Sequence, residues 1–163
     1  MKRRTFVGSI VGGMVAGVNG WSVRAEVFQL KAGDIPMRVF GKTGEKLTII
    51  GQAGGRFPLI SKEEAEAIVL RAYELGINYF DNAHSYWDGR SEEVYGAVLP
   101  PFRKKVFITT KSMKRTRKGA EEELNLSLKR LKTDYVDLWQ IHSVNEKAEV
   151  QEIFAPGGAI EAF

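Results

Sequence analysis

One stretch of the chain decides the fold: residues 76–86 read GINYFDNAHSY. Gly76 ends a helical pattern, residues 77–80 have the β-branched and aromatic character of a short strand, and polar side chains follow at once. Further strand-like runs are centred near Ile49, Ile108 and Trp139. The centres recur at about 30 residues, which is the length of one βαβ unit. This alternation predicts a parallel sheet.

Helical patterns fill the intervals between these strands. Ser61 and Glu64 form a capping box before an apolar stripe that ends at Gly76, and further helices are predicted over residues 91–99 and 120–131. The remaining expected elements are strands over residues 77–80, 106–110 and 135–141, a β-hairpin over 37–40 and 47–50, and the start of another helix over 160–163. Residues 47–50 are predicted to serve also as the first strand of the parallel sheet.

The length of the chain limits how much of a barrel it can form. Four βα units make either a small open sheet or half of a (β/α)8 barrel, and a complete barrel usually needs about 250 residues, whereas this chain has 163. A chain truncated at its C-terminus is the simpler explanation. In half a barrel the first and fourth strands are unpaired edges beside an apolar face, which predicts poor solubility or self-association through the exposed strand edges.

Composition excludes several classes of site and partner. The chain is 44% hydrophobic and 27% charged, which is typical of globular proteins, and it has no cysteine, which excludes disulfides, thiolate metal sites and a thiol nucleophile. The first 25 residues contain Lys2, Arg3, Arg4 and Arg24 and no acid, so 24 − 4 = 20 basic residues face 20 acidic ones in the remainder. This balance gives no support to a nucleic-acid partner.

The first 25 residues are arranged like a signal peptide. Lys2, Arg3 and Arg4 precede a short apolar run over residues 6–18, and small residues surround a cleavage position after Ala25. The paired arginines resemble a twin-arginine signal, so we expect export to the periplasm by the twin-arginine machinery, with 26–163 as the mature chain. The apolar run is shorter than the roughly 20 residues of a spanning helix, so we expect no stable membrane insertion. A retained anchor or a basic tail is the alternative, and it leaves the protein cytoplasmic.

Candidate functional residues follow the strands. In a parallel βα sheet they lie at the carboxyl ends of strands, which here selects Asp81, His84, Tyr86, Lys111 and His142. A phenol, an ammonium, a carboxylate and an imidazole suit proton transfer to or from an oxygen atom. The lysine can stabilise a phenolate, the aspartate can hold the lysine, and His142 can donate a hydrogen bond to a carbonyl oxygen.

Three segments resemble the signature of the aldo-keto reductase family: residues 76–93, Thr110-Lys111, and residues 134–142. The similarity runs from about Pro36 to the end and includes the hairpin that plugs the bottom of that family's barrel. It implies the N-terminal half (26–163) of a TIM (β/α)8 barrel, preceded by the hairpin. The implied reaction is hydride transfer from NADP(H) or NAD(H) to an aldehyde or ketone, a small carbonyl substrate.

The resemblance also implies roles for single residues. Tyr86 is the general acid, Lys111 and Asp81 activate it, and His142 positions the carbonyl. Asp81 is the one cofactor contact in this half, touching the nicotinamide ribose, and the main contacts are expected in strands five to eight. Asn82 replaces a frequent threonine, and Trp87 replaces a small residue, so Trp87 is expected to form an aromatic wall beside the carbonyl.

Less specific interpretations accompany this one. His84, Asp81 and His142 are a metal-ligand set only on paper, so we expect no metal and a hydrogen-bonding loop role for His84. The basic run 111–118 is predicted to be a solvated loop rather than an anion site. The alternative function is a catalytically inactive barrel fragment, or a binding or assembly module, that keeps the four residues by descent.

Overall fold

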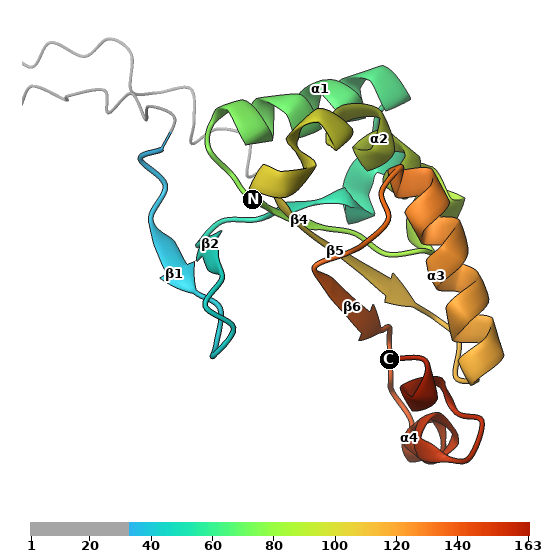
Figure 1. The fold of residues 1–163 in the computed structure, drawn as a ribbon. Coiled ribbons are helices and arrows are strands. Elements are labelled where there is room, and N and C mark those ends of the chain that lie inside the picture. The colour runs from blue at the N-terminus through green and yellow to red at the C-terminus, as the bar shows by residue number, and fades with distance from the viewer. Residues whose placement is uncertain (1–32) are drawn as a thin grey trace, which may run out of the picture.

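The computed structural model describes residues 33–163, and the signal-peptide and export predictions therefore lie outside the described residues. A parallel sheet lies at the centre, helices cover one of its faces, and a small hairpin lies beside it (Figure 1). The helices are α1 (Lys62–Glu74), α2 (Arg90–Val98), α3 (Arg117–Leu131) and α4 (Lys147–Phe154). The expected α/β architecture with a parallel sheet is confirmed.

The central sheet has four strands in the order of the chain, β3 (Gln52–Ala53), β4 (Tyr79–Asp81), β5 (Phe107–Ser112) and β6 (Leu138–Ile141). Each pairs in parallel with the next, with Ala53 opposite Asp81, and Asp81 opposite Thr109. Within the described residues β3 and β6 are the two edges, so the sheet is an open arc and not a closed barrel. The carboxyl ends of all four strands meet at one rim.

The hairpin corrects one prediction. β1 (Met37–Val39) pairs antiparallel with β2 (Lys46–Thr48) in a separate sheet, and the first strand of the parallel sheet is β3 rather than residues 47–50. The Thr48 N–H donates to Asn78 Oδ1 at 2.8 Å, and Ile49 N–H donates to the Pro36 carbonyl at 2.9 Å. These bonds commit the segment to the hairpin, and Gly51 then lets the chain pass close to the Tyr79 ring, which a Cβ at this position would overlap.

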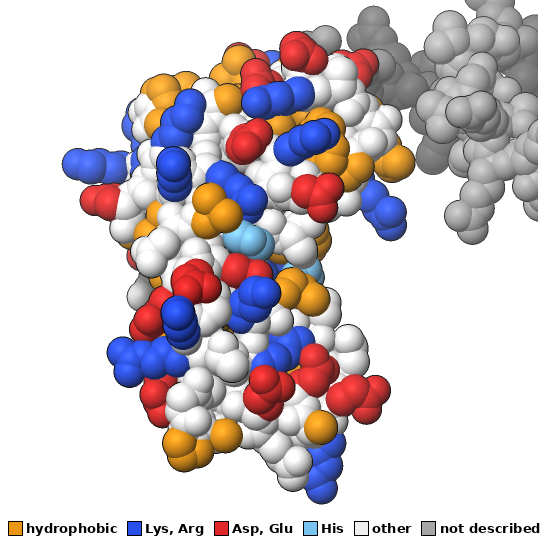
Figure 2. Space-filling model, turned by 90° about the vertical axis from the view of Figure 1, so that its right-hand side faces the viewer, with side chains coloured by type: hydrophobic (Ala, Val, Ile, Leu, Met, Phe, Trp, Pro, Cys, Tyr) orange, Lys and Arg blue, Asp and Glu red, His pale blue; other side chains and the backbone are white. Residues whose placement is uncertain are grey.

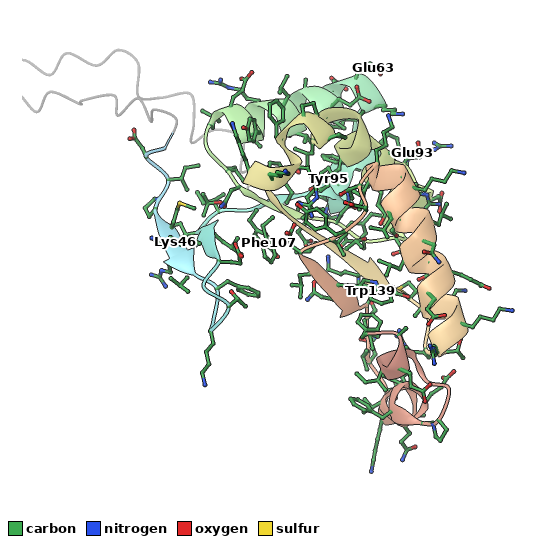
Figure 3. All side chains as sticks on the ribbon, viewed as in Figure 1. Lys46, Glu63, Glu93, Tyr95, Phe107 and Trp139 are labelled. Carbon is green, nitrogen blue, oxygen red and sulfur yellow. The ribbon has the colours of Figure 1, made fainter. Side chains whose placement is uncertain are left out.

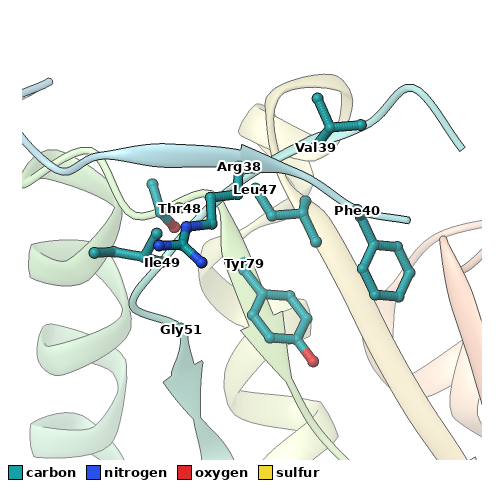
Figure 4. A pocket seen from close by; sticks show the side chains of 8 residues that line it. All are labelled: Arg38, Val39, Phe40, Leu47, Thr48, Ile49, Gly51 and Tyr79. Carbon is teal, nitrogen blue, oxygen red and sulfur yellow. The ribbon is translucent and has the colours of Figure 1, made fainter. Parts of the chain in front are cut away.

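A groove of about 400 Å³ lies between this hairpin and the sheet, and Tyr79 forms one of its walls (Figure 4). The Phe40 and Phe107 rings meet edge to face at 5.8 Å, so the hairpin packs on the amino end of the sheet. Phe107 points towards the hairpin in Figure 3. The hairpin and its groove therefore lie at the end of the sheet opposite the rim.

Side chains cap the starts of helices α1 and α3. The predicted capping box at Ser61 is present at the start of α1. The helix α3 starts earlier than predicted because the Thr116 hydroxyl accepts from the Gly119 N–H. Helix α4 was not predicted, and a 3-10 turn, η4 (Ala159–Glu161), stands where a helix was expected to begin. The remaining 3-10 turns are η1 (Gly54–Leu59), η2 (Tyr86–Gly89) and η3 (Pro100–Lys105).

The hydrophobic core lies between the sheet and helices α1 to α3. Phe80, Val94 and Tyr95 are fully buried there, and Tyr95 stands between α2 and the sheet (Figure 3). Gly96 permits a close helix contact, because a Cβ at this position would overlap the Arg130 carbonyl oxygen of α3. Helices α2 and α3 thus press directly against each other over the sheet.

Alternation along β5 divides the polar residues between two faces. Thr109 and Lys111 bond to Asp81 on the inner face, whereas Thr110 bonds to Glu92 of α2 on the outer face. Acidic and basic side chains are interspersed on the surface shown in Figure 2. Among residues 33–163 no helix has the length and apolar character needed to cross a membrane.

Candidate active site

The centre of the rim is an ion pair between neighbouring strands. Lys111 Nζ lies 2.8 Å from Asp81 Oδ1 and 2.9 Å from Oδ2. It also donates to the Asn82 carbonyl at 2.6 Å, and the side chains of Lys111 and Asp81 are only 13% and 24% exposed. The pairing of β4 with β5 places both residues on the same face, where the two side chains can meet.

Tyr86 follows this pair in the loop after β4. Its ring centroid lies 5.1 Å from Lys111 Nζ. The next two residues have left-handed backbones, with φ of 52° at Trp87 and 53° at Asp88. Such a conformation is costly for residues other than glycine and is typical of functional loops. This tight turn holds Tyr86 over the sheet rim.

His142 follows β6 and faces the tyrosine. Its backbone N–H donates to the Ser112 carbonyl at 2.8 Å, and its ring meets the Tyr86 ring edge to face at 5.5 Å. Burial lowers the pKa of His142 below its ordinary 6.5, the positive charges of Lys111 and Arg115 add to this, and Asp81 opposes it. The imidazole is therefore neutral at pH 7 and can donate one N–H.

A brace behind His142 was missed in the sequence. Arg115 donates to the carbonyls of His142 at 2.9 Å and Ser143 at 3.1 Å, and it bonds to Glu149 Oε1 at 2.7 Å. The Arg115 side chain is 10% exposed, so this part of the basic run 111–118 is not the solvated loop that was expected. Lys111 lies in β5, and Arg117 and Lys118 begin α3.

Glu149 joins the brace to helix α4. It accepts backbone N–H bonds from Asn145 and Glu146, and these, with the Arg115 guanidinium, lower its pKa to about 2. The spacing of Glu146 and Glu149 is the capping-box pattern at the start of α4. That spacing was the available signal for both the helix and the brace.

Comparison with known proteins identifies a family for this chain. The model of the aldo/keto reductase family matches residues 50–162. The chain belongs to the aldo/keto reductase family. The resemblance seen in the sequence is thereby confirmed for the family.

Individual relatives agree with this assignment. The chain is 37% identical over 114 residues to the uncharacterized oxidoreductase YqkF of Bacillus subtilis, a match that covers 63% of this chain and 35% of the relative. An aldo/keto reductase from Brucella melitensis superposes with a TM-score of 0.61 at 28% identity, over 79% of this chain and 48% of the other.

A Bombyx mori aldo-keto reductase in complex with NADP superposes with a TM-score of 0.56 at 29% identity, over 66% of this chain and 38% of the other. The chain thus spans between about a third and a half of the length of these proteins.

Two further residues of this aldo/keto reductase chain lie in the segment after β4. His84 bonds through Nδ1 to Ser127 at 3.1 Å and faces Glu123 through Nε2 at 3.8 Å, so it has the hydrogen-bonding role that was expected. Trp87 is partly buried against the hydrophobic core, and the aromatic wall beside the carbonyl stays a prediction. No group of three or more potential metal ligands occurs within the described part of the chain.

Proposed function

We propose that the protein is an NAD(P)H-dependent reductase that converts an aldehyde or ketone into an alcohol, with Tyr86 as the general acid. One observation carries this proposal: the Asp81–Lys111 pair places an ammonium 5.1 Å from the Tyr86 ring centroid at the rim where the family signature lies. A phenol is a slow acid near neutral pH unless a cation stabilises the phenolate that it leaves behind. Lys111 supplies that cation.

The described residues fit one edge of a nicotinamide site. Asp81 keeps 24% of its side chain exposed while both carboxylate oxygens accept bonds from inside the protein. Its outward lone pairs remain available to a ribose hydroxyl. The Bombyx mori relative was solved with NADP, which supports NADP(H) or NAD(H) as the cofactor. Bound there, the cofactor would supply the hydride.

The chain's own side chains would handle the proton. The neutral imidazole of His142 donates its N–H to the carbonyl oxygen of the substrate and orients it towards the tyrosine. Tyr86 then gives its phenolic proton to the same oxygen, and Lys111 stabilises the phenolate. Asp81 balances the charge of Lys111 and keeps the ammonium below the ring. Water afterwards returns a proton to the phenolate.

The test is Tyr86→Phe in the full-length protein. Removal of a general acid should lower kcat for carbonyl reduction by roughly 10²- to 10⁴-fold, whereas the affinity for NADPH, measured by fluorescence titration, should be unchanged. Tyr73→Phe is the control, because Tyr73 stacks on Phe102 away from the rim. Unchanged turnover in Tyr86→Phe would refute the assigned role.

The competing function is a binding or assembly module that keeps these residues by descent. It predicts a different result for the unmutated protein in the same assays. It predicts that the unmutated full-length protein neither binds NADPH nor reduces any small aldehyde. Binding of NADPH by the unmutated protein would contradict this alternative.

A further inference from the structure

Two neighbouring threonines of β5 are equally buried, but their hydroxyls bond to carboxylates on opposite faces of the sheet. Thr109 and Thr110 are both fully buried. Thr109 Oγ1 donates to Asp81 Oδ1 at 2.8 Å on the inner face, and Thr110 Oγ1 donates to Glu92 Oε1 at 2.6 Å on the outer face. Only the first of these carboxylates belongs to the candidate active site.

We propose that Thr109 is a positioning residue, whose buried hydroxyl fixes the rotation of the Asp81 carboxylate and thereby holds the Lys111 ammonium beside Tyr86. This inference rests on the proposed function and adds a residue that acts through Asp81 without touching substrate. The family signature in residues 76–93 and 134–142 does not include Thr109.

Without Thr109 the carboxylate of Asp81 would be free to rotate. The pairing of β4 with β3 and β5 fixes the main chain of Asp81 but not its side chain. The terminal torsion of an aspartate is broad, and Lys111 has a flexible stem that can follow a rotating carboxylate. A second, rigidly mounted donor on Oδ1 removes this freedom, because β-branched Thr109 has few rotamers and lies in a paired strand.

Tyr79 completes the surroundings of Thr109. Burial and the negative charge of Asp81 raise the pKa of Tyr79, and a hydrogen bond with Thr109 partly offsets this rise. The bond that the structure shows for the Thr109 hydroxyl proton is the one to Asp81 Oδ1 at 2.8 Å.

The experiment compares Thr109→Val with Thr110→Val in the full-length protein. Both replacements keep the shape of the side chain and remove one buried hydroxyl, so they share any general loss of stability. We expect Thr109→Val to lower kcat by roughly 10- to 100-fold, as misplacement of catalytic groups does, with little change in KM. The pH–rate profile should also shift. Thr110→Val should keep the original profile, and Thr109→Ser, which retains the hydroxyl, should restore it.

A second readout does not depend on turnover. Charged and titratable groups of the sheet and the two loops face the ring of His142. They are Asp81, Lys111, Tyr86 and Arg115. If Lys111 loses its fixed position in Thr109→Val, the pKa of His142 should rise towards 6.5 in an NMR titration. It should stay unchanged in Thr110→Val and Thr109→Ser.

Turnover and the His142 titration test the proposed function and the role of Thr109 separately. Absence of reductase activity in the unmutated protein would defeat the proposed function, while the His142 titration would still decide the role of Thr109. Equal behaviour of Thr109→Val and Thr110→Val in that titration would overturn the positioning role. A changed titration that Thr109→Ser does not restore would also overturn it, since the hydroxyl would then not be the cause.

Discussion

At the scale of single residues, the pKa of His142 depends on the charges of its neighbours. Its lowered pKa means that the unfolded chain takes up a proton more readily than the folded one, so stability falls as the pH drops below 6.5 and through the folded value. Lys111→Met removes one cause of the lowering and leaves Asp81 unbalanced. We therefore expect the pKa of His142 to rise in this variant, as measured by NMR of the imidazole protons.

The His84 signal provides the control in the same spectra, because the His84 ring lies beside Ser127 and Glu123 of helix α3. A shift of both histidines would indicate a general rearrangement. An unchanged His142 would contradict the placement of the ammonium beside the ring.

The sequence predicted that four residues of the candidate site share one rim, and it missed two others. Asp81, Tyr86, Lys111 and His142 lie at or just after the carboxyl ends of strands, and the carboxyl ends of parallel strands must share one edge. Arg115 was missed because the direction of a long flexible side chain is set by the partners it finds, here two carbonyls and Glu149. The contact that Thr109 makes depends likewise on the alternation and register of β5, which become definite only once the strand is paired.

At the scale of elements, the brace ties the loop after β6 to helix α4. Glu149 has a pKa of about 2 because backbone N–H groups and Arg115 stabilise its charge. It therefore contributes stability above its ordinary value of 4.5, and this contribution is lost as the pH falls towards 2. Glu149→Gln should lower the midpoint of urea unfolding at pH 5, and the difference from the unmutated chain should shrink at pH 3.

Glu121→Gln is the matched control for this measurement. Glu121 pairs with Arg117 on the surface, where both side chains are about half exposed, and such pairs contribute little. A difference between Glu149→Gln and the unmutated chain that does not change between pH 5 and pH 3 would contradict the role of the charge.

Elements with strong local signals were predicted well. The α1 capping box and the strands β4 to β6 follow from residues close together in the sequence. The first sheet strand was misplaced because residues 47–50 have a stronger β pattern than Gln52–Ala53, and only the bonds to Asn78 and Pro36 assign them to the hairpin. These bonds join distant or irregular segments, which periodicity does not detect.

At the scale of the whole molecule, the open edges of the sheet predict association. Strands β3 and β6 lack a second neighbour within residues 33–163, and unpaired edges are templates for pairing. The 163-residue chain, with a mass of 18.2 kDa, should therefore show a concentration-dependent mass above the monomer by light scattering. Leu138→Lys in β6 should reduce this association, whereas Leu126→Lys on helix α3 should not. A monomer at every concentration would contradict the prediction.

The order of the strands has a consequence for synthesis on the ribosome. Because β3, β4, β5 and β6 lie side by side in the order in which they are translated, each new strand finds its partner already made. Asp81, Tyr86, Lys111 and His142 can thus meet as soon as β6 has left the exit tunnel, since neighbours along the chain close short loops at low entropic cost. The nascent chain would assemble the rim that carries these four residues vectorially, one βα unit at a time.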